Sequence, residues 1–235
     1  MTGHDPDLVD SAGVLLLLQL ADSGFPTGAF AHSGGVEALL RRGIVSDAGS
    51  LEAHARAYAS MVVAPGDTWF VRAAHDAAVR TDAARLRAVA AEDRAARIPR
   101  LARQASTAIG ASFLHAARAI TRDPEEAARL AWVDAVLSAL TPRCSVFGAV
   151  GGAFQLPAGA VATAHCYLAV SGFVAPAVRL GVVGPVQAQA IVRSVLTGST
   201  VAKAAPEDGA WALFSPMLDV GAMQHESAPE RLFQS

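Results

Sequence analysis

The chain has 235 residues, of which 52% are hydrophobic and 17% charged, and its formal net charge is −2. This length suits one large domain, and the apolar content allows a substantial core, which argues against disorder over most of the chain. The near-neutral charge argues against the basic surface that nucleic-acid binding requires. The two cysteines, Cys144 and Cys166, are too few for a disulfide framework and indicate a reduced, intracellular protein.

A leucine-rich run at residues 14–18 comes first in chain order. Acidic residues but no Lys or Arg precede it, so it lacks the positive start of a secretory signal, and we expect a helix. The segment ADSGFPTGAFAHSGGVEALLRRG, residues 21–43, then interrupts the pattern with Gly and Pro before it returns to a helical sequence. We expect a structural corner at residues 24–35, presented at the protein surface.

Helix signals dominate the remaining chain. We expect helices at residues 51–63, 68–79, 98–120, 124–140, 158–180 and 186–196. Ser46 or Ser50 would cap the first of these, and the sequence Ala-Pro-Gly at 64–66 would break it. Asp123 followed by Pro124 is a strong start for the fourth. Sustained alternation of period two is hard to find, so the sequence predicts an all-α fold, a single helical-bundle domain of about eight to ten helices.

Residues 144–178 contain no Asp, Glu, Lys or Arg, and a membrane span needs about 20 apolar residues. However, Pro157 splits this stretch, polar residues interrupt the remainder, and small residues dominate it. Small residues let helices approach closely. We therefore interpret the stretch as helices packed in the core and near a dimer interface, with a membrane span as the alternative.

Two kinds of chemistry are excluded by their sequence requirements. The only lysine, Lys203, lies in TVAKAAP, which lacks the glycines and hydroxyl of a P-loop. The histidines at 4, 32, 54, 75, 115, 165 and 225 show no metal-ligand spacing, so the sequence predicts no metal site. His165 and Cys166 diverge by about 100° on a helix, which favours a core histidine beside a buried thiol. A site shared across a symmetric dimer stays open.

The sequence Ala-His-Ser-Gly-Gly at residues 31–35 is similar to the G-x-S-x-G motif of serine hydrolases. A nucleophile elbow needs a strand before the serine, and the preceding GFPTGAF is punctuated by Pro and Gly. We favour a structural role, in which Ser33 caps a helix that begins at Gly34 and Glu37 faces the positive end of that helix. A hydrolase with an atypical elbow at Ser33 is the alternative.

Four ordered blocks together resemble the UreF-type urease accessory proteins, over essentially the whole chain. They are LQLADSGFPTGAFAHSGGVEALLRRGIV, RLARQASTAIGASFL, CSVFGAVGGAFQLP with VAPAVRLGVVGPVQAQ, and PMLDVGAMQHESAPERLFQS at the C-terminus. Ala29, the pair Ala31-His32, and Ala228-Pro229 depart from the usual family pattern, which suits an actinobacterial-type branch. The matching positions are Pro26, Gly28, Phe30, Ser33, Gly35, Glu37, Arg103, Gly110, Phe113, Arg179, Leu218, Asp219, His225, Glu226, Arg231, Leu232, Phe233 and Ser235.

The resemblance implies an all-α homodimer in the cytoplasm, without enzymatic activity or a stably bound cofactor, and without membrane or nucleic-acid partners. It implies a helical domain at 1–205 and an irregular, partner-binding C-terminal tail at 206–235. Such a protein binds UreD (UreH) and recruits the GTPase UreG to apo-urease, with nickel in transit. His225, Glu226, Arg231, Leu232 and Phe233 are expected to contact UreD. The surface turn carries Pro26, Gly28, Ser33, Gly35 and Glu37, and the helices with Arg103, Gly110, Gly148 and Arg179 are expected to face UreG or the second protomer.

Overall fold

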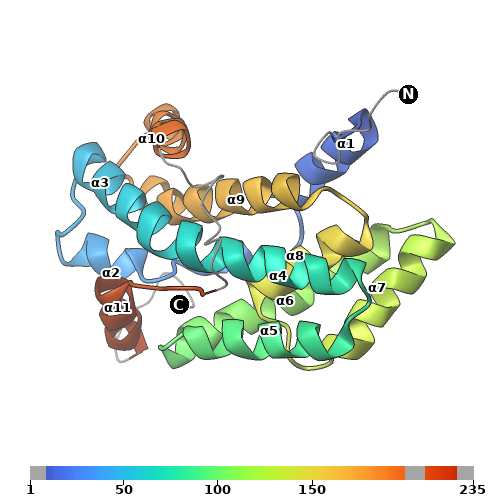
Figure 1. Cartoon of the computed structure of the whole chain (residues 1–235). Helices are drawn as coiled ribbons and strands as arrows, with labels where there is room; N and C mark the ends of the chain where they lie inside the picture. Colours follow the sequence, from blue (N-terminus) through green and yellow to red (C-terminus); the bar gives the residue numbers. More distant parts are fainter. Residues whose placement is uncertain (1–8, 199–209, 227–235) are drawn as a thin grey trace.

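The computed structural model describes residues 9–198 and 210–226, and within these ranges every regular element is a helix (Figure 1). This confirms the all-α prediction. Two helices, α5 and α11, were not predicted. The described residues contain eleven α-helices, whereas the sequence predicted about eight to ten. They are α1 (Ser11–Leu20), α2 (Val36–Arg41), α3 (Ala48–Tyr58), α4 (Thr68–Val79), α5 (Ala83–Ala96), α6 (Arg100–Ile120), α7 (Pro124–Leu137), α8 (Arg143–Ala153), α9 (Ala158–Arg179), α10 (Pro185–Gly198) and α11 (Pro216–Glu226).

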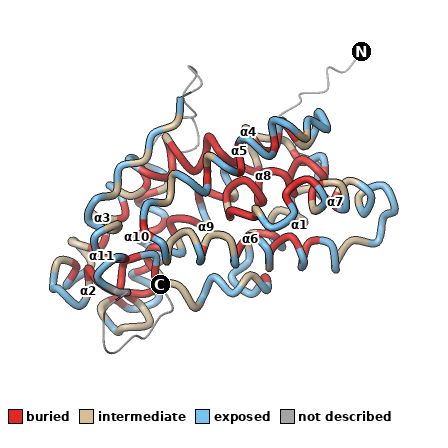
Figure 2. The backbone as a smooth tube through the Cα atoms, turned by 90° about the horizontal axis from the view of Figure 1, so that it is seen from below, coloured by how far each residue is buried: buried red, intermediate tan, exposed pale blue. Residues whose placement is uncertain are grey.

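Helix α8 lies at the centre of the bundle. It is contacted by α4, α5, α6, α7 and α9, and α4 crosses the middle of the molecule beside it (Figure 1). Every residue from Cys144 to Ala153 is buried, and Figure 2 shows the same concentration of buried backbone around α8 and its neighbours. A helix with no charged residue over these ten positions can be enclosed on all sides. The prediction of packed core helices in this stretch is confirmed for α8 and for the buried face of α9.

Glycine allows these helices to approach one another closely. A Cβ atom on Gly148 would lie 2.0 Å from the carbonyl oxygen of Val71 in α4. One on Gly110 in α6 would lie 2.1 Å from the carbonyl oxygen of Thr141. Both distances are far below van der Waals contact, so only glycine fits at these crossings.

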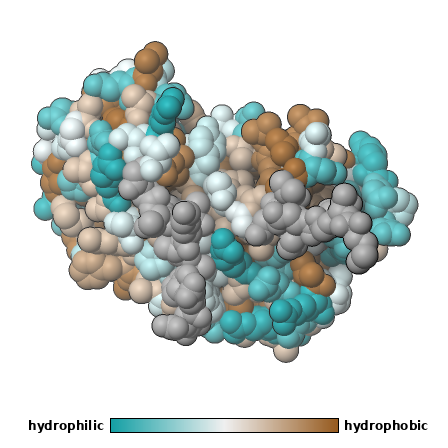
Figure 3. Space-filling view, turned by 45° about the horizontal axis from the view of Figure 1, so that its top comes forward, coloured by the Kyte–Doolittle hydropathy of each residue, from teal (hydrophilic) through white to brown (hydrophobic). Residues whose placement is uncertain are grey.

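Helix α9 is long and apolar enough to cross a membrane, judged by length and composition, and no other helix of the described residues meets that test. Its most apolar window has a mean hydropathy of 1.5, and 56% of that window is buried inside the protein. A core helix shows the same properties. On the face shown in Figure 3, hydrophobic residues gather in separate places and form no continuous belt.

The helix starts follow local capping chemistry, with one correction. Asp123 caps α7 by accepting the backbone N–H groups of Glu125 and Glu126, as predicted. Helix α3, however, is capped by Asp47 rather than by Ser46 or Ser50. Ser50 is the third helical residue, and it completes a reciprocal capping box with Asp47. Helix α3 therefore starts three residues before the predicted position.

The predicted break at residues 64–66 does not occur. A π-helix at Ala59–Asp67, labelled η2, joins α3 to α4 without interruption. Pro65 has no N–H, so it cannot donate the bond that a π-helix would send five residues back, to Ser60. Two other carbonyls of η2 accept from the C-terminal segment: the backbone N–H of Phe214 donates to Met61 at 3.1 Å, and that of Ala212 donates to Pro65 at 3.2 Å. The C-terminal segment is thus hydrogen-bonded to the helical turn that contains the proline.

Candidate functional site

The corner between α1 and α2 is a compact surface feature anchored by one aromatic side chain. Phe25 is buried and packs on Phe113 of α6, with ring centroids 5.2 Å apart. Gly28 has a left-handed backbone with φ of 72°, a conformation that L side chains rarely adopt. Pro26, Gly28 and Phe30 are exposed. The glycine and the buried ring together let the chain reverse direction while its tip stays at the surface.

Ser33 is not the helix cap that the sequence predicted. Helix α2 begins at Val36, and its cap position is Gly35, whose backbone is left-handed with φ of 88°. Gly34 is left-handed as well, so two glycines separate Ser33 from the helix. The residues that precede Ser33 form α1 and a short 3-10 turn at Ala29–Ala31, rather than a strand. The strand–turn–helix geometry of a hydrolase elbow is therefore not found here, and the hydrolase alternative has no support.

Glu37 lies in the first turn of α2, as predicted, and is completely buried. Its Oε1 atom accepts a hydrogen bond from Nε of Arg41 at 2.9 Å. The same oxygen forms an ion pair with Nη2 of Arg41 at 2.8 Å. A carboxylate at this position also faces the positive end of the helix dipole. Glu37 thus fixes α2 from the inside.

Helix α11 packs directly against this corner, beside α2 (Figure 1). A Cβ atom on Gly35 would lie 2.8 Å from the carbonyl oxygen of Leu218, and one on Gly221 would lie 3.1 Å from Cβ of Ala38. Arg42 donates a hydrogen bond to Gln224 at 3.2 Å. The expectation of an irregular tail is therefore wrong for residues 216–226, because this segment gains a packing surface on α2 that no sequence periodicity reveals.

The predicted UreD-contacting residues are only partly covered by the structure. His225 and Glu226 belong to the last turn of α11, and their backbone is helical. Arg231, Leu232 and Phe233 lie outside the described residues. On α11 itself, Met217, Val220 and Met223 are each about half exposed, at 47%, 45% and 45%. We call these three residues the α11 apolar face.

Arg179, at the end of α9, holds the tip of the corner. Its guanidinium carbon lies 4.1 Å from the centroid of the Phe30 ring, and its Nη1 donates to the backbone carbonyl of Phe30. A guanidinium over an aromatic ring is attracted by the ring quadrupole. Phe30 is 72% exposed, so this contact presents an aromatic ring to the surroundings in a fixed position.

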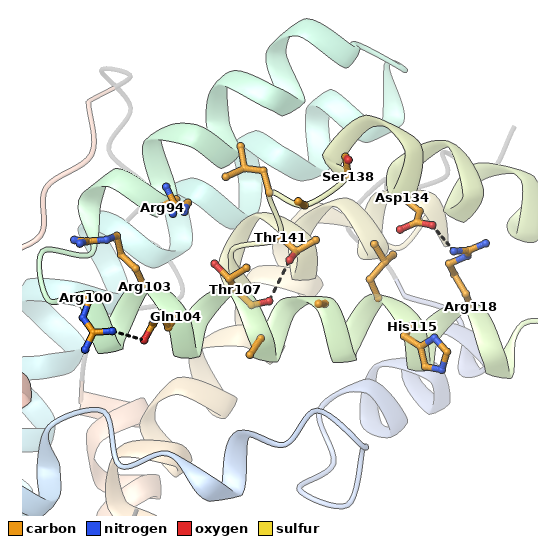
Figure 4. A pocket seen from close by; sticks show the side chains of 15 residues that line it. Arg94, Arg100, Arg103, Gln104, Thr107, His115, Arg118, Asp134, Ser138 and Thr141 are labelled. Atoms are coloured by element: carbon orange, nitrogen blue, oxygen red, sulfur yellow. Dashed lines mark hydrogen bonds and ion pairs between the residues drawn. The ribbon is translucent and has the colours of Figure 1, made fainter. Parts of the chain in front are cut away.

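Arg103 and Gly110 lie on α6, which borders an open groove of about 840 Å³ (Figure 4). Arg94, Arg100 and Arg103 gather at one end of this groove, and the ion pair of Arg118 with Asp134 lies at the other. Arg103 donates to the backbone carbonyls of Arg97 and Ile98, so it also fixes the connection between α5 and α6. The close contacts of Gly110 and Gly148 lie within the chain, and the assignment of their helices to a partner stays a prediction.

A cluster of charged, thiol and imidazole side chains lies where η2, α5, α8 and α9 meet. We call it the buried cluster. Four of its members are buried and two arginines are half-buried: they are Asp67, Asp93, Cys144 and His165, with Arg97 and Arg143.

Arg97 connects three members of the buried cluster. Its Nη2 atom donates to Oδ1 of Asp67 at 2.6 Å, to Oδ1 of Asp93 at 3.0 Å and to Sγ of Cys144 at 3.3 Å. Both carboxylates are fully buried. A buried carboxylate must be paired with opposite charge, and the single guanidinium does this for both.

The second arginine and a backbone donor complete the compensation. Arg143 Nη2 lies 3.6 Å from Oδ2 of Asp67. Ser145 donates to Oδ2 of Asp93 through its backbone N–H at 3.0 Å and its hydroxyl at 2.9 Å. Burial raises the pKa of Asp67, but Arg97 and Arg143 outweigh this effect and hold it below its ordinary value. The two aspartates and two arginines therefore sum to zero charge.

Cys144 and His165 are the uncharged members of the cluster. Burial, with Arg143 nearby, lowers the pKa of His165 to about 3, so its ring is neutral at pH 7. Burial and the two aspartates raise the pKa of Cys144 well above that of a free thiol. The prediction of a core histidine beside a buried thiol is confirmed, because His165 and Cys166 are each 2% exposed and point in different directions. Cys166 lies 3.5 Å from Thr68, whereas His165 groups with Cys144. Sequence spacing could not reveal this grouping, since its members come from separate helices.

These features define the class of protein, over the described residues, as an all-α helical bundle. Its described surface carries an apolar helix face and a glycine-built corner, its interior charges are compensated, and the elbow expected of a hydrolase is not formed at Ser33.

Comparison with known proteins identifies the family. The UreF family model matches residues 45–196. The urease accessory protein UreF of Arthrobacter sp. (strain FB24) is 30% identical over 226 residues, which cover 94% of this chain and 96% of that protein. The UreF proteins of Rhizobium leguminosarum bv. viciae and Rhizobium johnstonii are 30% and 31% identical, again over 94% of this chain and 96% of each relative. The chain belongs to the UreF family of urease accessory proteins.

Proposed function

We propose that this protein is required for the insertion of nickel into apo-urease, where it joins UreD (UreH) to the GTPase UreG and modulates GTP hydrolysis by UreG. It acts as a cytoplasmic homodimer and has no enzymatic activity of its own. Nickel passes through the complex, and the protein holds no stable cofactor. Membership of the UreF family and similarity along nearly the whole chain support this function.

The observation that carries the proposal is the packing of α11 on the corner. A Cβ atom at Gly35 would meet the backbone of Leu218, so α11 is seated on the corner without space for a side chain. This contact points the α11 apolar face away from the protein, directly before the tail residues assigned to UreD. Three half-exposed apolar side chains on one short helix are typical of a helix that docks on a partner.

Charge recognition by the GTPase is the second part of the proposal. Four arginines line the α6 groove against one aspartate, so the groove carries a net positive charge. A surface of this kind favours an acidic partner. We assign the α6 side to UreG, as the resemblance of the Arg103 helix implies.

The test compares two exposed valines. Val220 lies on the α11 apolar face and is 45% exposed, whereas Val186 at the start of α10 is 85% exposed and lies outside that face. In Val220→Asp, the buried charge should weaken co-purification with UreD at least tenfold and lower urease activation in cells. Val186→Asp should retain both. Equal UreD capture by the two variants, with equal thermal melting, would show that α11 is not the docking helix.

A further inference from the structure

Three side chains of the buried cluster are of types that can ligate a metal ion, and they lie close together although their sequence positions are far apart. Asp67 ends η2, Cys144 lies in the first turn of α8, and His165 lies in α9. One ligand atom from each lies within 4.8 Å of the other two, and all three residues are buried. Carboxylate, thiolate and imidazole together form the mixed donor set that suits borderline divalent cations such as Ni²⁺, Co²⁺ and Zn²⁺.

Two polar atoms of this group have no hydrogen-bond partner among the residues that the structure describes. They are Nδ1 of His165, whose residue is 2% exposed, and Oδ2 of Asp67, which is fully buried. Oδ2 has an ion-pair partner in Arg143 at 3.6 Å but accepts no hydrogen bond, so His165 Nδ1 is the atom of the two without any partner in the described ranges. Arg97 occupies the other carboxylate oxygen, Oδ1. Buried polar atoms without partners are costly, and they are a common sign of an ion or water that completes the site.

We propose that Asp67, Cys144 and His165 form a site for one borderline divalent cation, with a water molecule as the fourth ligand. Three protein ligands and one position left for water distinguish such a site from closed, four-ligand structural sites. Tetrahedral coordination brings ligand atoms to about 3.5 Å from one another, so pairs that are now separated by up to 4.8 Å move closer when the ion binds.

Charge balance is compatible with occupancy. Before binding, the two aspartates and two arginines of the cluster sum to zero. The cation adds two positive charges, and the Cys144 thiol releases one proton to solvent, which leaves a net charge of +1. Arg143 is the cluster's outer arginine, because its side chain is 33% exposed whereas that of Arg97 is 15% exposed.

Two residues of the surface region that we assign to UreD are affected by the arginines of the cluster. Burial and the charge of Arg143 lower the pKa of His32 in the corner. Burial raises the pKa of Asp219 in α11, and the charge of Arg97 opposes this effect. The identity of the ion as nickel rests on the proposed function, whereas the existence of the site does not.

The experiment uses Co²⁺ as the probe, because a cobalt–thiolate bond produces a near-ultraviolet charge-transfer band that histidine or carboxylate ligands do not produce. The purified full-length protein, treated with a thiol-free reductant, is titrated with Co²⁺. We expect one equivalent to produce the band. The two cysteines provide a matched control, since both are buried and only Cys144 belongs to the site. Cys166→Ala should retain the band, and Cys144→Ala should lose it.

A second variant tests the histidine. His165→Gln should weaken Co²⁺ binding at least tenfold while Cys144 still contributes a band at higher metal concentration.

Circular dichroism of each metal-free variant verifies the helical fold, and Ni²⁺ should raise the melting temperature of the wild type but not of Cys144→Ala. Absence of the band in a folded wild type would overturn the proposal, as would its loss in Cys166→Ala alone. Neither result affects the UreD capture experiment, so the two proposals fail separately.

Discussion

The backbone N–H of Phe214 donates a hydrogen bond to the carbonyl of Met61, at 3.1 Å, across 153 positions of the chain. Met61 belongs to the π-helix that contains Pro65. The two residues that precede Phe214 extend the same contact. Leu213 packs on Gly66, and Ala212 donates to Pro65. The segment before α11 is therefore part of the core rather than an appendage.

The first prediction compares two aromatic residues of this segment. Trp211 packs on Phe70, with centroids 5.1 Å apart, and donates to Glu92 at 3.1 Å. Trp211→Ala should lower the free energy of unfolding by about 1.5–3 kcal/mol. Phe214 is 66% exposed and contributes its backbone, so Phe214→Ala should change stability by less than about 0.5 kcal/mol. Chemical denaturation measures both, and equal effects would show that the segment is not seated on the core.

The second prediction concerns the buried cluster. Arg97→Ala leaves Asp67 and Asp93 buried beside a single remaining arginine, so it should cost about 3–5 kcal/mol of stability. Arg118→Ala breaks an ion pair with Asp134 in which both side chains are about 45% exposed, and it should cost less than about 1 kcal/mol. Thermal or urea unfolding of the two variants provides the comparison. A small loss in Arg97→Ala would mean that water reaches the aspartates.

Much of the fold could be predicted from the sequence, because helix boundaries depend on local chemistry. Asp123 and Pro124 mark the start of α7 by capping and backbone geometry, and the predicted range 68–79 matches α4. What could not be predicted depends on distant segments. Pro65 is an expected helix breaker, yet the chain continues there as a π-helix, to which residues 212 and 214 donate hydrogen bonds.

The candidate site was less predictable than the fold for the same reason. Cys144 and His165 come together because α8 and α9 cross, and neither residue has a ligand at helical spacing. Helix α11 was not predicted either. The side of α11 opposite its apolar face packs on α2, and this contact depends on the close approach at Gly35 and Gly221. Local patterns predict the elements, whereas close helix crossings determine which side chains meet.

The third prediction uses two adjacent glycines of the corner. Gly34 and Gly35 both have left-handed backbones, with φ of 60° and 88°. A Cβ atom at Gly34 would meet nothing within 4 Å, so Gly34→Ala should cost only the backbone penalty of about 1–2 kcal/mol. At Gly35 the same atom would lie 2.8 Å from the Leu218 carbonyl oxygen, so α11 must move. Gly35→Ala should therefore reduce UreD capture strongly, and Gly34→Ala should retain it.

The fourth prediction concerns the helix crossings of the core. Gly148→Ala places a Cβ atom 2.0 Å from the Val71 carbonyl oxygen, and overpacking of this kind should cost about 1–3 kcal/mol or more. Gly172 in α9 is the matched control, because a Cβ atom there would meet nothing within 4 Å. Gly172→Ala should raise stability by up to about 1 kcal/mol through helix propensity. Melting temperatures that fall in both variants would indicate that Gly172 also lies at a contact.

The last prediction concerns the end of the tail, for which the resemblance implies contact with UreD. Full burial of Leu232 and Phe233 in a partner groove would contribute about 1.5–3 kcal/mol each. Because about 1.4 kcal/mol corresponds to a tenfold change, loss of both should weaken UreD binding by several powers of ten. Deletion of residues 230–235 removes these anchors and leaves Trp211, Leu213 and α11 in place. The truncated protein should therefore melt like the wild type, yet fail to capture UreD in a pull-down and fail to activate urease in cells.

Deletion of residues 210–235 should lower the melting temperature as well, since it removes the Trp211 contact with Phe70 and exposes the π-helix. If the shorter deletion still captures UreD at wild-type strength, the anchors lie on the α11 apolar face rather than in the last six residues.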